Sequence, residues 1–69
     1  MPITFADVNT EYEVKRIKGT SKAKQHLEDL GFHVGSMITI TSKSGEDLIV
    51  KVKDSRVAIS REMANKIMV

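Results

Sequence analysis

The residues best suited to chemistry in this chain are two histidines with a pair of acids between them. His26 and His33 are separated by Glu28 and Asp29. Imidazole and carboxylate groups are ligands that zinc and ferrous iron accept, so these four residues form the candidate metal site. A separation of seven residues would put both histidines on one face of a helix. Because Gly31 interrupts the helical pattern between them, the sequence favours two exposed surface histidines over a metal site.

Other kinds of catalytic or cofactor site lack the residues they need. The chain of 69 residues has no cysteine, which excludes disulfides, thiolate metal sites and cysteine nucleophiles. The acid pairs Glu28–Asp29 and Glu46–Asp47 are adjacent in sequence, so their side chains point apart and do not share a proton. The glycines are dispersed and form no phosphate-binding loop. We therefore expect no enzymatic activity, no cofactor and a fold that needs no bound metal.

The segment that must position these histidines, Leu27–Ile40, changes from a helical pattern to a strand pattern. Gly31 stands where a helix ends in a left-handed residue, and we predict that conformation for it. Phe32 can then fold back on Leu27, the apolar contact that accompanies such helix ends. Gly35 is predicted to turn the chain into the following strand. Together these features indicate a rigid connection between a helix and a strand.

The rest of the chain is predicted to form short strands joined by turns. A helical turn is expected at Thr4–Val8, capped by Thr4, with Phe5 and Val8 packed inward. A strand is expected next at Glu13–Lys18, followed by a helix that is capped by Thr20 or Ser21 and runs to Leu30. Two further strands, Met37–Ser42 and Asp47–Val52, are expected on either side of a Lys43–Glu46 loop with Gly45 in a turn conformation. The chain is then expected to form a Lys53–Ser55 turn, a strand at Arg56–Ile59, a helical turn capped by Ser60, and a last strand at Lys66–Val69. The expected core comprises Val14, Leu27, Leu30, Ile38, Val50 and Ile59. This pattern is typical of a small, mainly β barrel of five strands with one short helix, in a single domain over residues 1–69.

Charge and composition narrow the possible partners. The net charge is +2, and only Phe5, Tyr12 and Phe32 are aromatic, so a nucleic-acid interface built on base stacking is not expected. Basic residues gather in the segment from Lys15 to Lys24, with no acid inside it. No apolar run is long enough to span a bilayer, so we expect any membrane contact to come through a partner. The absence of cysteine suits a reducing compartment, and a cytoplasmic location is the default expectation.

Five pieces of the chain carry a resemblance to a known family. They are TFADV at Thr4–Val8, VKRIKG at Val14–Gly19, LEDLGFHVGSMITI at Leu27–Ile40, SGEDLIVKVKDSRVAIS at Ser44–Ser60, and the closing Ala64, Ile67 and Val69. Their order and spacing resemble the FeoA family of ferrous iron transport proteins. The chain departs from that pattern at Val34, where the family usually has a proline.

The resemblance implies an SH3-like barrel that acts as a non-enzymatic accessory protein by binding and regulating the membrane GTPase transporter FeoB. We expect the docking surface to include Lys15, Arg16, Lys24, Leu27, Phe32, His33 and Met37, with Gly31, Gly35 and Gly45 as structural turn residues and His26 and His33 as weak metal candidates. Weak self-association stays open. The alternative is a sensor module like the barrel of iron-dependent repressors, which would call for a winged-helix domain upstream of Met1.

Overall fold

The computed structural model describes all 69 residues. The elements in chain order are the 3-10 turn η1 (Ile3–Phe5), β1 (Glu11–Glu13), β2 (Arg16–Ile17), α1 (Ser21–Asp29), β3 (Met37–Ser44), β4 (Asp47–Val52), β5 (Ser55–Ser60), α2 (Arg61–Ala64) and β6 (Ile67–Met68). The molecule is therefore mainly β, as the sequence predicted, with α1 as its one longer helix. No helix has both the length and the apolar character needed to cross a bilayer.

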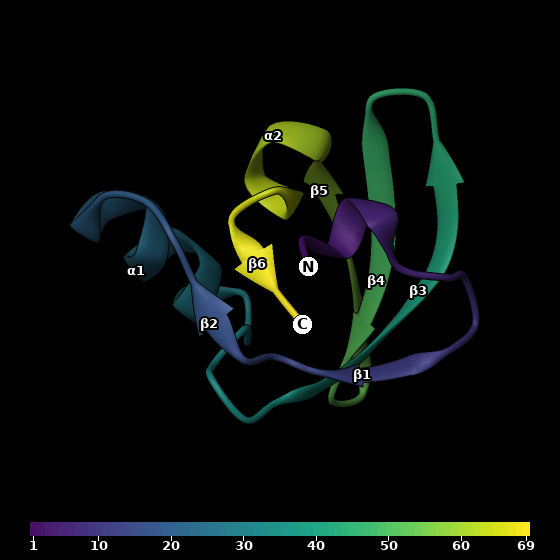
Figure 1. Cartoon of the computed structure of the whole chain (residues 1–69), viewed down its shortest axis with the longest axis horizontal. Helices are drawn as coiled ribbons and strands as arrows, with labels where there is room; N and C mark the ends of the chain where they lie inside the picture. The colour runs from purple at the N-terminus through teal and green to yellow at the C-terminus, as the bar shows by residue number, and fades with distance from the viewer.

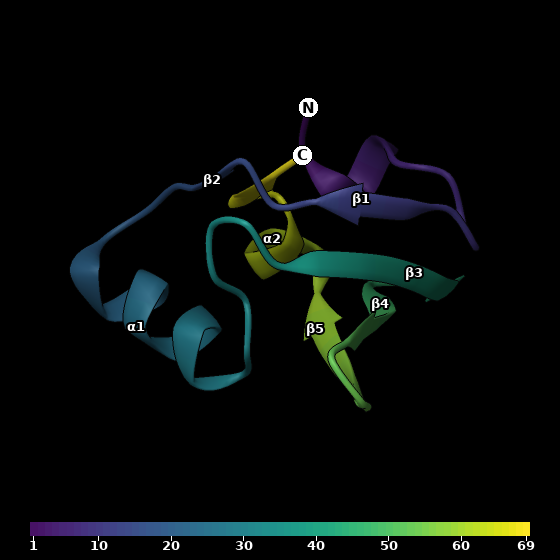
Figure 2. The same cartoon turned by 90° about the horizontal axis from the view of Figure 1, so that it is seen from below.

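The strands form two antiparallel sheets, one with the order β1-β3-β4-β5 and one made of β2 and β6. Figures 1 and 2 show the two-stranded sheet on the same side of the molecule as both chain ends and η1, with β4 and β5 on the far side. The α1 helix lies beside the sheets rather than over the long one (Figure 2). The core fills the space between the two layers.

The first strand was predicted wrongly as one element, because the chain bends at Val14 and changes sheets there. The Val14 N–H donates to the Ser36 carbonyl at 2.9 Å, and the Val14 carbonyl accepts from the Gly35 N–H at 2.8 Å. One residue later, the Lys15 N–H donates to the Met68 carbonyl at 2.7 Å. The predicted strand is thus divided into β1 and β2, which have different partners. The result is six strands in two sheets, one strand more than predicted.

The core consists of the alternate residues that each strand points inward. On β3 and β4 the buried residues are Ile38, Ile40, Leu48, Val50 and Val52, each at most 2% exposed. Helix and turn residues complete the core, and the full buried apolar set adds Ile3, Ala6, Val14, Ile17, Leu27, Phe32, Ile59, Ala64 and Ile67. Every predicted core residue is in this set except Leu30, which is partly buried against it.

The N-terminal turn begins one residue earlier and ends three residues earlier than predicted, and this changes which side chains are buried. The turn η1 begins at Ile3 after Pro2 and has no side-chain cap, so Thr4 is inside it rather than at its start. Ile3 is fully buried, while Phe5 is 74% exposed and Val8 38% exposed. The prediction that Phe5 and Val8 pack inward is therefore wrong. In a 3-10 turn, neighbouring side chains point in different directions, and here Ile3 takes the inward one.

The two β-hairpins are tighter than predicted. Ser44 pairs with Asp47, which leaves a two-residue loop with Gly45 at a φ of 56°. Val52 pairs with Ser55, and Lys53 has the same φ of 56° in that second loop. Two-residue loops fix the pairing register of the strands they join. This register decides which residues of β3, β4 and β5 face the core.

Candidate docking surface

The end of α1 is locked by a Schellman motif, which uses the helix-ending residues that the sequence indicated. The Phe32 N–H donates to the Leu27 carbonyl at 3.0 Å, and the Gly31 N–H donates to the Glu28 carbonyl at 2.9 Å. Gly31 has a φ of 107°, which a residue with a side chain rarely adopts, so the predicted left-handed conformation is confirmed. Leu27 and Phe32 are both fully buried and anchor this helix end in the core.

A β-turn, His33–Ser36, follows directly and leads into β3. The Ser36 N–H donates to the His33 carbonyl at 2.9 Å, and the His33 N–H donates to the Ser36 hydroxyl at 3.3 Å. Gly35 has a φ of 94°, which fits the third position of a type II turn. The Gly35 N–H is also bonded to the Val14 carbonyl. The turn is therefore held to α1 on one side and to the β1–β2 bend on the other.

The exposed side chains of this region differ from those that were predicted from the sequence to contact a partner. His33 is exposed, Val34 is 68% exposed and Met37 is 48% exposed. Leu27 and Phe32 were predicted to contact a partner, but they have no accessible surface and only support the turn. Val34 was missed, although the second position of a turn with glycine at the third points its side chain outward. We call His33, Val34 and Met37 the turn surface.

Basic side chains of the predicted run are exposed and almost free of ion pairs. Lys15, Arg16, Lys18, Lys22 and Lys24 are all exposed, the last two on α1. The one salt bridge of the structure joins Lys15 to Glu13 at 3.9 Å, and both side chains are more than half exposed. An exposed pair of this kind contributes little to stability. The run therefore leaves positive charge available to an external partner.

The two histidines do not gather with acids into a metal-binding group. His26 lies exposed on α1 and His33 lies exposed in the turn beyond the helix end. No three side chains drawn from histidine, aspartate and glutamate come together in an arrangement that could hold a metal ion. Of the two acids between them in sequence, Asp29 accepts a hydrogen bond from the Gln25 amide at 2.9 Å.

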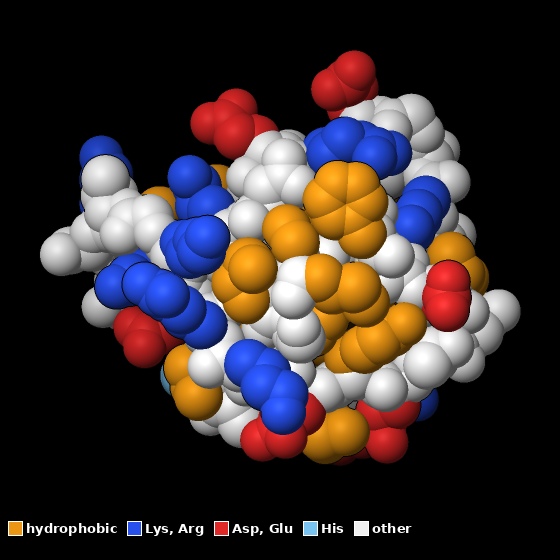
Figure 3. Space-filling view, in the orientation of Figure 1, with side chains coloured by type: hydrophobic (Ala, Val, Ile, Leu, Met, Phe, Trp, Pro, Cys, Tyr) orange, Lys and Arg blue, Asp and Glu red, His pale blue; other side chains and the backbone are white.

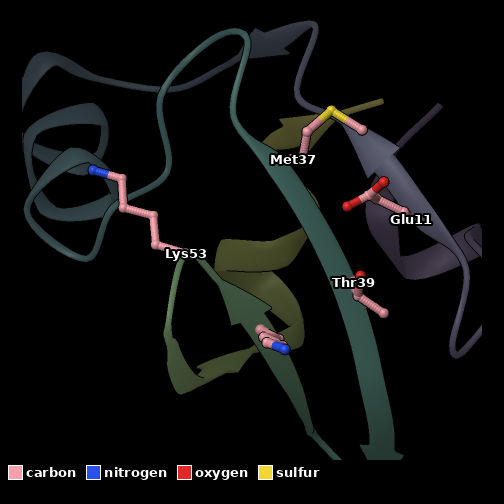
Figure 4. A pocket seen from close by; sticks show the side chains of 5 residues that line it. Glu11, Met37, Thr39 and Lys53 are labelled. Atoms are coloured by element: carbon pink, nitrogen blue, oxygen red, sulfur yellow. The ribbon is translucent and has the colours of Figure 1, made fainter.

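The surface has one hollow, on the outer face of β1, β3 and β4. It is lined by Glu11, Met37, Thr39, Lys51 and Lys53. Glu11 pairs with Thr39, and Thr39 pairs with Lys51, so three of these side chains form a row across the sheet. In Figure 4, Lys53 points away from Glu11 and Met37, toward the α1 side. The side chains do not converge on a point, so the hollow offers no catalytic arrangement.

Replacing Val34 with proline is expected to stabilise the fold by about 0.4–1 kcal/mol, because proline restricts the unfolded chain and suits the second position of this turn. The Val34 N–H donates no hydrogen bond within the chain, so none is lost. Denaturant unfolding followed by circular dichroism measures the change, with Val34→Thr as the control that leaves the backbone free. A midpoint below that of wild type would show that the turn cannot accept proline.

Comparisons with known proteins agree on one family. A family model described as the FeoA domain matches residues 1–69. A Methanocaldococcus jannaschii protein assigned as Fe(2+) transport protein A is 35% identical over 68 residues, which cover 99% of this chain and 83% of that protein.

Solved structures establish the fold. One similar structure is the FeoA of Stenotrophomonas maltophilia, which is described as an SH3 domain protein and was solved with zinc. It is 23% identical to this chain, with a TM-score of 0.85, and the match covers 99% of this chain and 87% of that one. A manganese-dependent transcriptional repressor is 13% identical with a TM-score of 0.88, covering 97% of this chain and 39% of that one. At these identities the similarity concerns the fold alone. It confirms the SH3-like architecture that the sequence predicted.

Proposed function

This chain belongs to the FeoA family of ferrous iron transport accessory proteins, and we propose that it acts by docking directly on the cytoplasmic region of a FeoB-type membrane GTPase transporter. The docking surface is the turn surface, His33, Val34 and Met37, together with the exposed basic residues of α1, the helix that leads into the turn. The observation that carries this proposal is an exposed apolar side chain on a turn that backbone hydrogen bonds hold to the rest of the fold. The protein regulates its partner by contact and works in the cytoplasm.

The rigidity of the turn supports its role in recognition. Both ends of the His33–Ser36 turn are tied by backbone hydrogen bonds, and Phe32 is buried beneath it. A preformed surface loses little conformational entropy on binding, so more of the contact energy appears as affinity. An exposed valine and methionine give such a surface an apolar centre. Methionine in particular adapts to the shape of its partner.

The positive charge on α1 supports an encounter that is steered by electrostatic attraction. Lys22 and Lys24 are exposed on α1, and neither forms an ion pair. Unpaired surface cations raise the rate of association with an acidic partner at low ionic strength and lose that effect as salt is added. We therefore expect the partner surface to be acidic around an apolar contact.

The surface chemistry also supports a role without catalysis. The hollow of Figure 4 contains no histidine and no convergent acid and base. A general acid–base mechanism requires such groups within hydrogen-bond reach of one substrate position. Binding to another protein requires only the exposed turn and its flanking charge. Regulation by protein–protein contact therefore explains the exposed residues more simply than catalysis does.

Binding assays with the cytoplasmic region of the transporter test this proposal. Val34→Asp places a charge at the centre of the turn surface and is expected to weaken binding by about tenfold or more. Lys24→Glu and His33→Ala are expected to weaken it by several-fold, Lys24→Glu more strongly at low salt. All three positions are exposed, so the variants should stay folded, which circular dichroism checks.

Two control variants make similar chemical changes at positions outside the turn surface. Arg56→Glu reverses an exposed charge on β5, and Phe5→Ser removes an exposed apolar side chain from η1. Neither should change binding by more than about twofold, since neither position lies on the turn surface. Folded Val34→Asp and Lys24→Glu proteins that bind as tightly as wild type would show that the proposed surface is wrong.

A further inference from the structure

The two chain ends meet on a face that carries a separate apolar surface. The Val69 N–H donates to the Met1 carbonyl at 2.8 Å, and Pro2 bridges to Met68. Phe5, 74% exposed, and Met1, 51% exposed, project from this face. Figure 3 shows hydrophobic side chains gathered at its centre, over the chain ends and η1. We call Met1, Pro2, Phe5, Met68 and Val69 the end patch.

The exposure of Phe5 is built into the fold. Ile3 is fully buried and Thr4 is 9% exposed, and the Thr4 hydroxyl donates to the Asn65 side-chain oxygen at 2.7 Å. These two residues fix η1 against the core and against the end of α2. Phe5 therefore cannot turn inward without breaking that packing. A large aromatic side chain held outward in this way is a candidate contact for an apolar or interfacial environment.

Cations flank the end patch on two sides. Arg16 is the cross-strand partner of Met68, so their side chains lie together on the outer face of the β2–β6 sheet. Strand alternation puts Lys18 and Lys66 on that same outer face, since Ile17 and Ile67 between them are buried. On the other side, the Lys43 ammonium donates to the Thr4 carbonyl at 3.1 Å. None of these four cations forms a salt bridge.

Most acids lie around this arrangement rather than within it. Figure 3 shows acidic side chains mainly toward the rim of this face, with one on the face itself to the right of the apolar centre, while lysine and arginine side chains border that centre. Asp7 follows η1, and its backbone N–H donates to the Tyr12 hydroxyl at 3.0 Å. The end patch thus combines a projecting aromatic ring with positive charge on either side.

We propose that the end patch binds the surface of an anionic lipid bilayer. Phe5 and Met1 enter the headgroup boundary, and Arg16, Lys18, Lys66 and Lys43 lie against the lipid phosphates. Aromatic and apolar side chains contribute by the area they bury at the interface, and each nearby cation adds attraction to anionic lipid. The attachment is weak and reversible, and it does not span the bilayer. The sequence had suggested that membrane contact comes only through a partner, because no apolar run is long enough to span a bilayer.

Charge and area favour lipid over the other possible occupants. A second copy docked patch to patch would bring the same four cations toward their counterparts, which opposes association. A stable protein partner needs ~800 Å² on each side, about a fifth of the total accessible surface of 4247 Å². A whole aromatic side chain buries only ~200 Å², so this apolar centre by itself does not make a protein interface, just as the turn surface needs the residues around it to make one. A bilayer needs only the projecting side chains and the charge.

Flotation with lipid vesicles tests this inference without the transporter. The full chain is mixed with vesicles of phosphatidylcholine alone and with vesicles that also contain phosphatidylglycerol, and the bound fraction is measured. We expect binding to the anionic vesicles only, weakened by added salt. Phe5→Ser should reduce the apparent affinity by about tenfold, and Arg16→Glu by more than the ~5-fold expected for loss of one cation. Both side chains are exposed, so the folds should persist, which thermal melts check.

Matched controls separate this surface from the turn surface. Val34→Ser removes an exposed apolar side chain, and Arg56→Glu reverses an exposed cation, both away from the end patch. Each should leave vesicle binding within about twofold of wild type. Wild-type protein that stays unbound to anionic vesicles overturns the inference, as does a folded Phe5→Ser variant that binds as wild type. Loss of transporter binding in Phe5→Ser, with no vesicle binding by wild type, would assign the patch to a protein instead. Because the transporter is absent, this test and the docking test can fail independently.

Discussion

Replacing Phe32 with alanine is expected to remove most of the stability of this fold. Phe32 is the largest of the fully buried side chains and anchors the Schellman motif at the end of α1. A Phe→Ala change in a packed core costs about 3–5 kcal/mol. A chain of 69 residues typically has a free energy of unfolding of only ~3–10 kcal/mol. Urea unfolding followed by circular dichroism should therefore show a strongly lowered midpoint or a chain that is largely unfolded without denaturant.

Phe5→Ala is the matched control, because it makes the same chemical change at a side chain that is 74% exposed. It should change the free energy of unfolding by no more than ~0.5 kcal/mol. The contrast between the two phenylalanines tests the placement of η1 as well as the core. Equal destabilisation by both substitutions would contradict the observed burial, and a mild effect at Phe32 would mean that the helix end is not anchored there.

The second large effect is expected at Gly31. Gly31→Val should destabilise the fold by about 1–3 kcal/mol, because a β-branched residue is strained at a positive φ. The φ of 107° is in the positive range that favours glycine and well beyond the +50 to +70° at which residues with side chains enter that range. A Cβ at this position would be 3.6 Å from Val52, an ordinary contact, so the cost arises from the backbone rather than from a clash. Thermal and urea midpoints measure it.

Gly45→Asn provides the control for this substitution. Gly45 has a φ of 56°, which asparagine tolerates, and nothing lies within 4 Å of a Cβ added there. The expected change in the free energy of unfolding is below ~1 kcal/mol. Unfolding midpoints for Gly31→Val that match wild type would contradict a locked helix end. A larger loss at Gly45 than at Gly31 would contradict the assignment of strain.

The parts of the fold that depend on near neighbours in sequence were predictable. The end of α1 required only a glycine and an apolar residue after it, and the structure has both in the expected roles. The Ser60 cap was also expected, and the Ser60 hydroxyl accepts from the Met63 N–H at 3.2 Å. Thr20 caps α1 in the same way, at 3.1 Å from the Ala23 N–H. In each case the signal and the structure are within a few residues of each other.

The parts that depend on distant contacts were not predictable. The bend at Val14 results from hydrogen bonds to Gly35 and Ser36 on one side, with Met68 bonded one residue later. No pattern within residues 13–18 encodes that change of partner. The burial of Ile3 in place of Phe5 likewise depends on packing against the core and on the contact between Thr4 and Asn65.

The segment that the sequence suggested for docking is exposed in the structure, but not at every residue that was predicted to contact a partner. The segment around the helix end is exposed as expected at His33 and Met37. Periodicity already marked Leu27 as core, and the structure resolves that ambiguity by burying it completely together with Phe32. The exposed apolar residue of the turn is Val34 instead of Leu27 or Phe32. Its role follows from turn geometry, which the sequence signalled through Gly35.

Backbone amide chemical shifts, measured by NMR on the labelled chain during titration with the unlabelled cytoplasmic region of the transporter, test the docking surface most directly. We expect the largest changes at residues 33–37 and along α1 from Lys22 to Lys24, with little change in the β4–β5 loop around Lys53 and Asp54. Amides of the end patch should respond to anionic vesicles instead. Shift changes centred on that loop or on the end patch during the transporter titration, or no changes at all, would contradict docking through the turn surface.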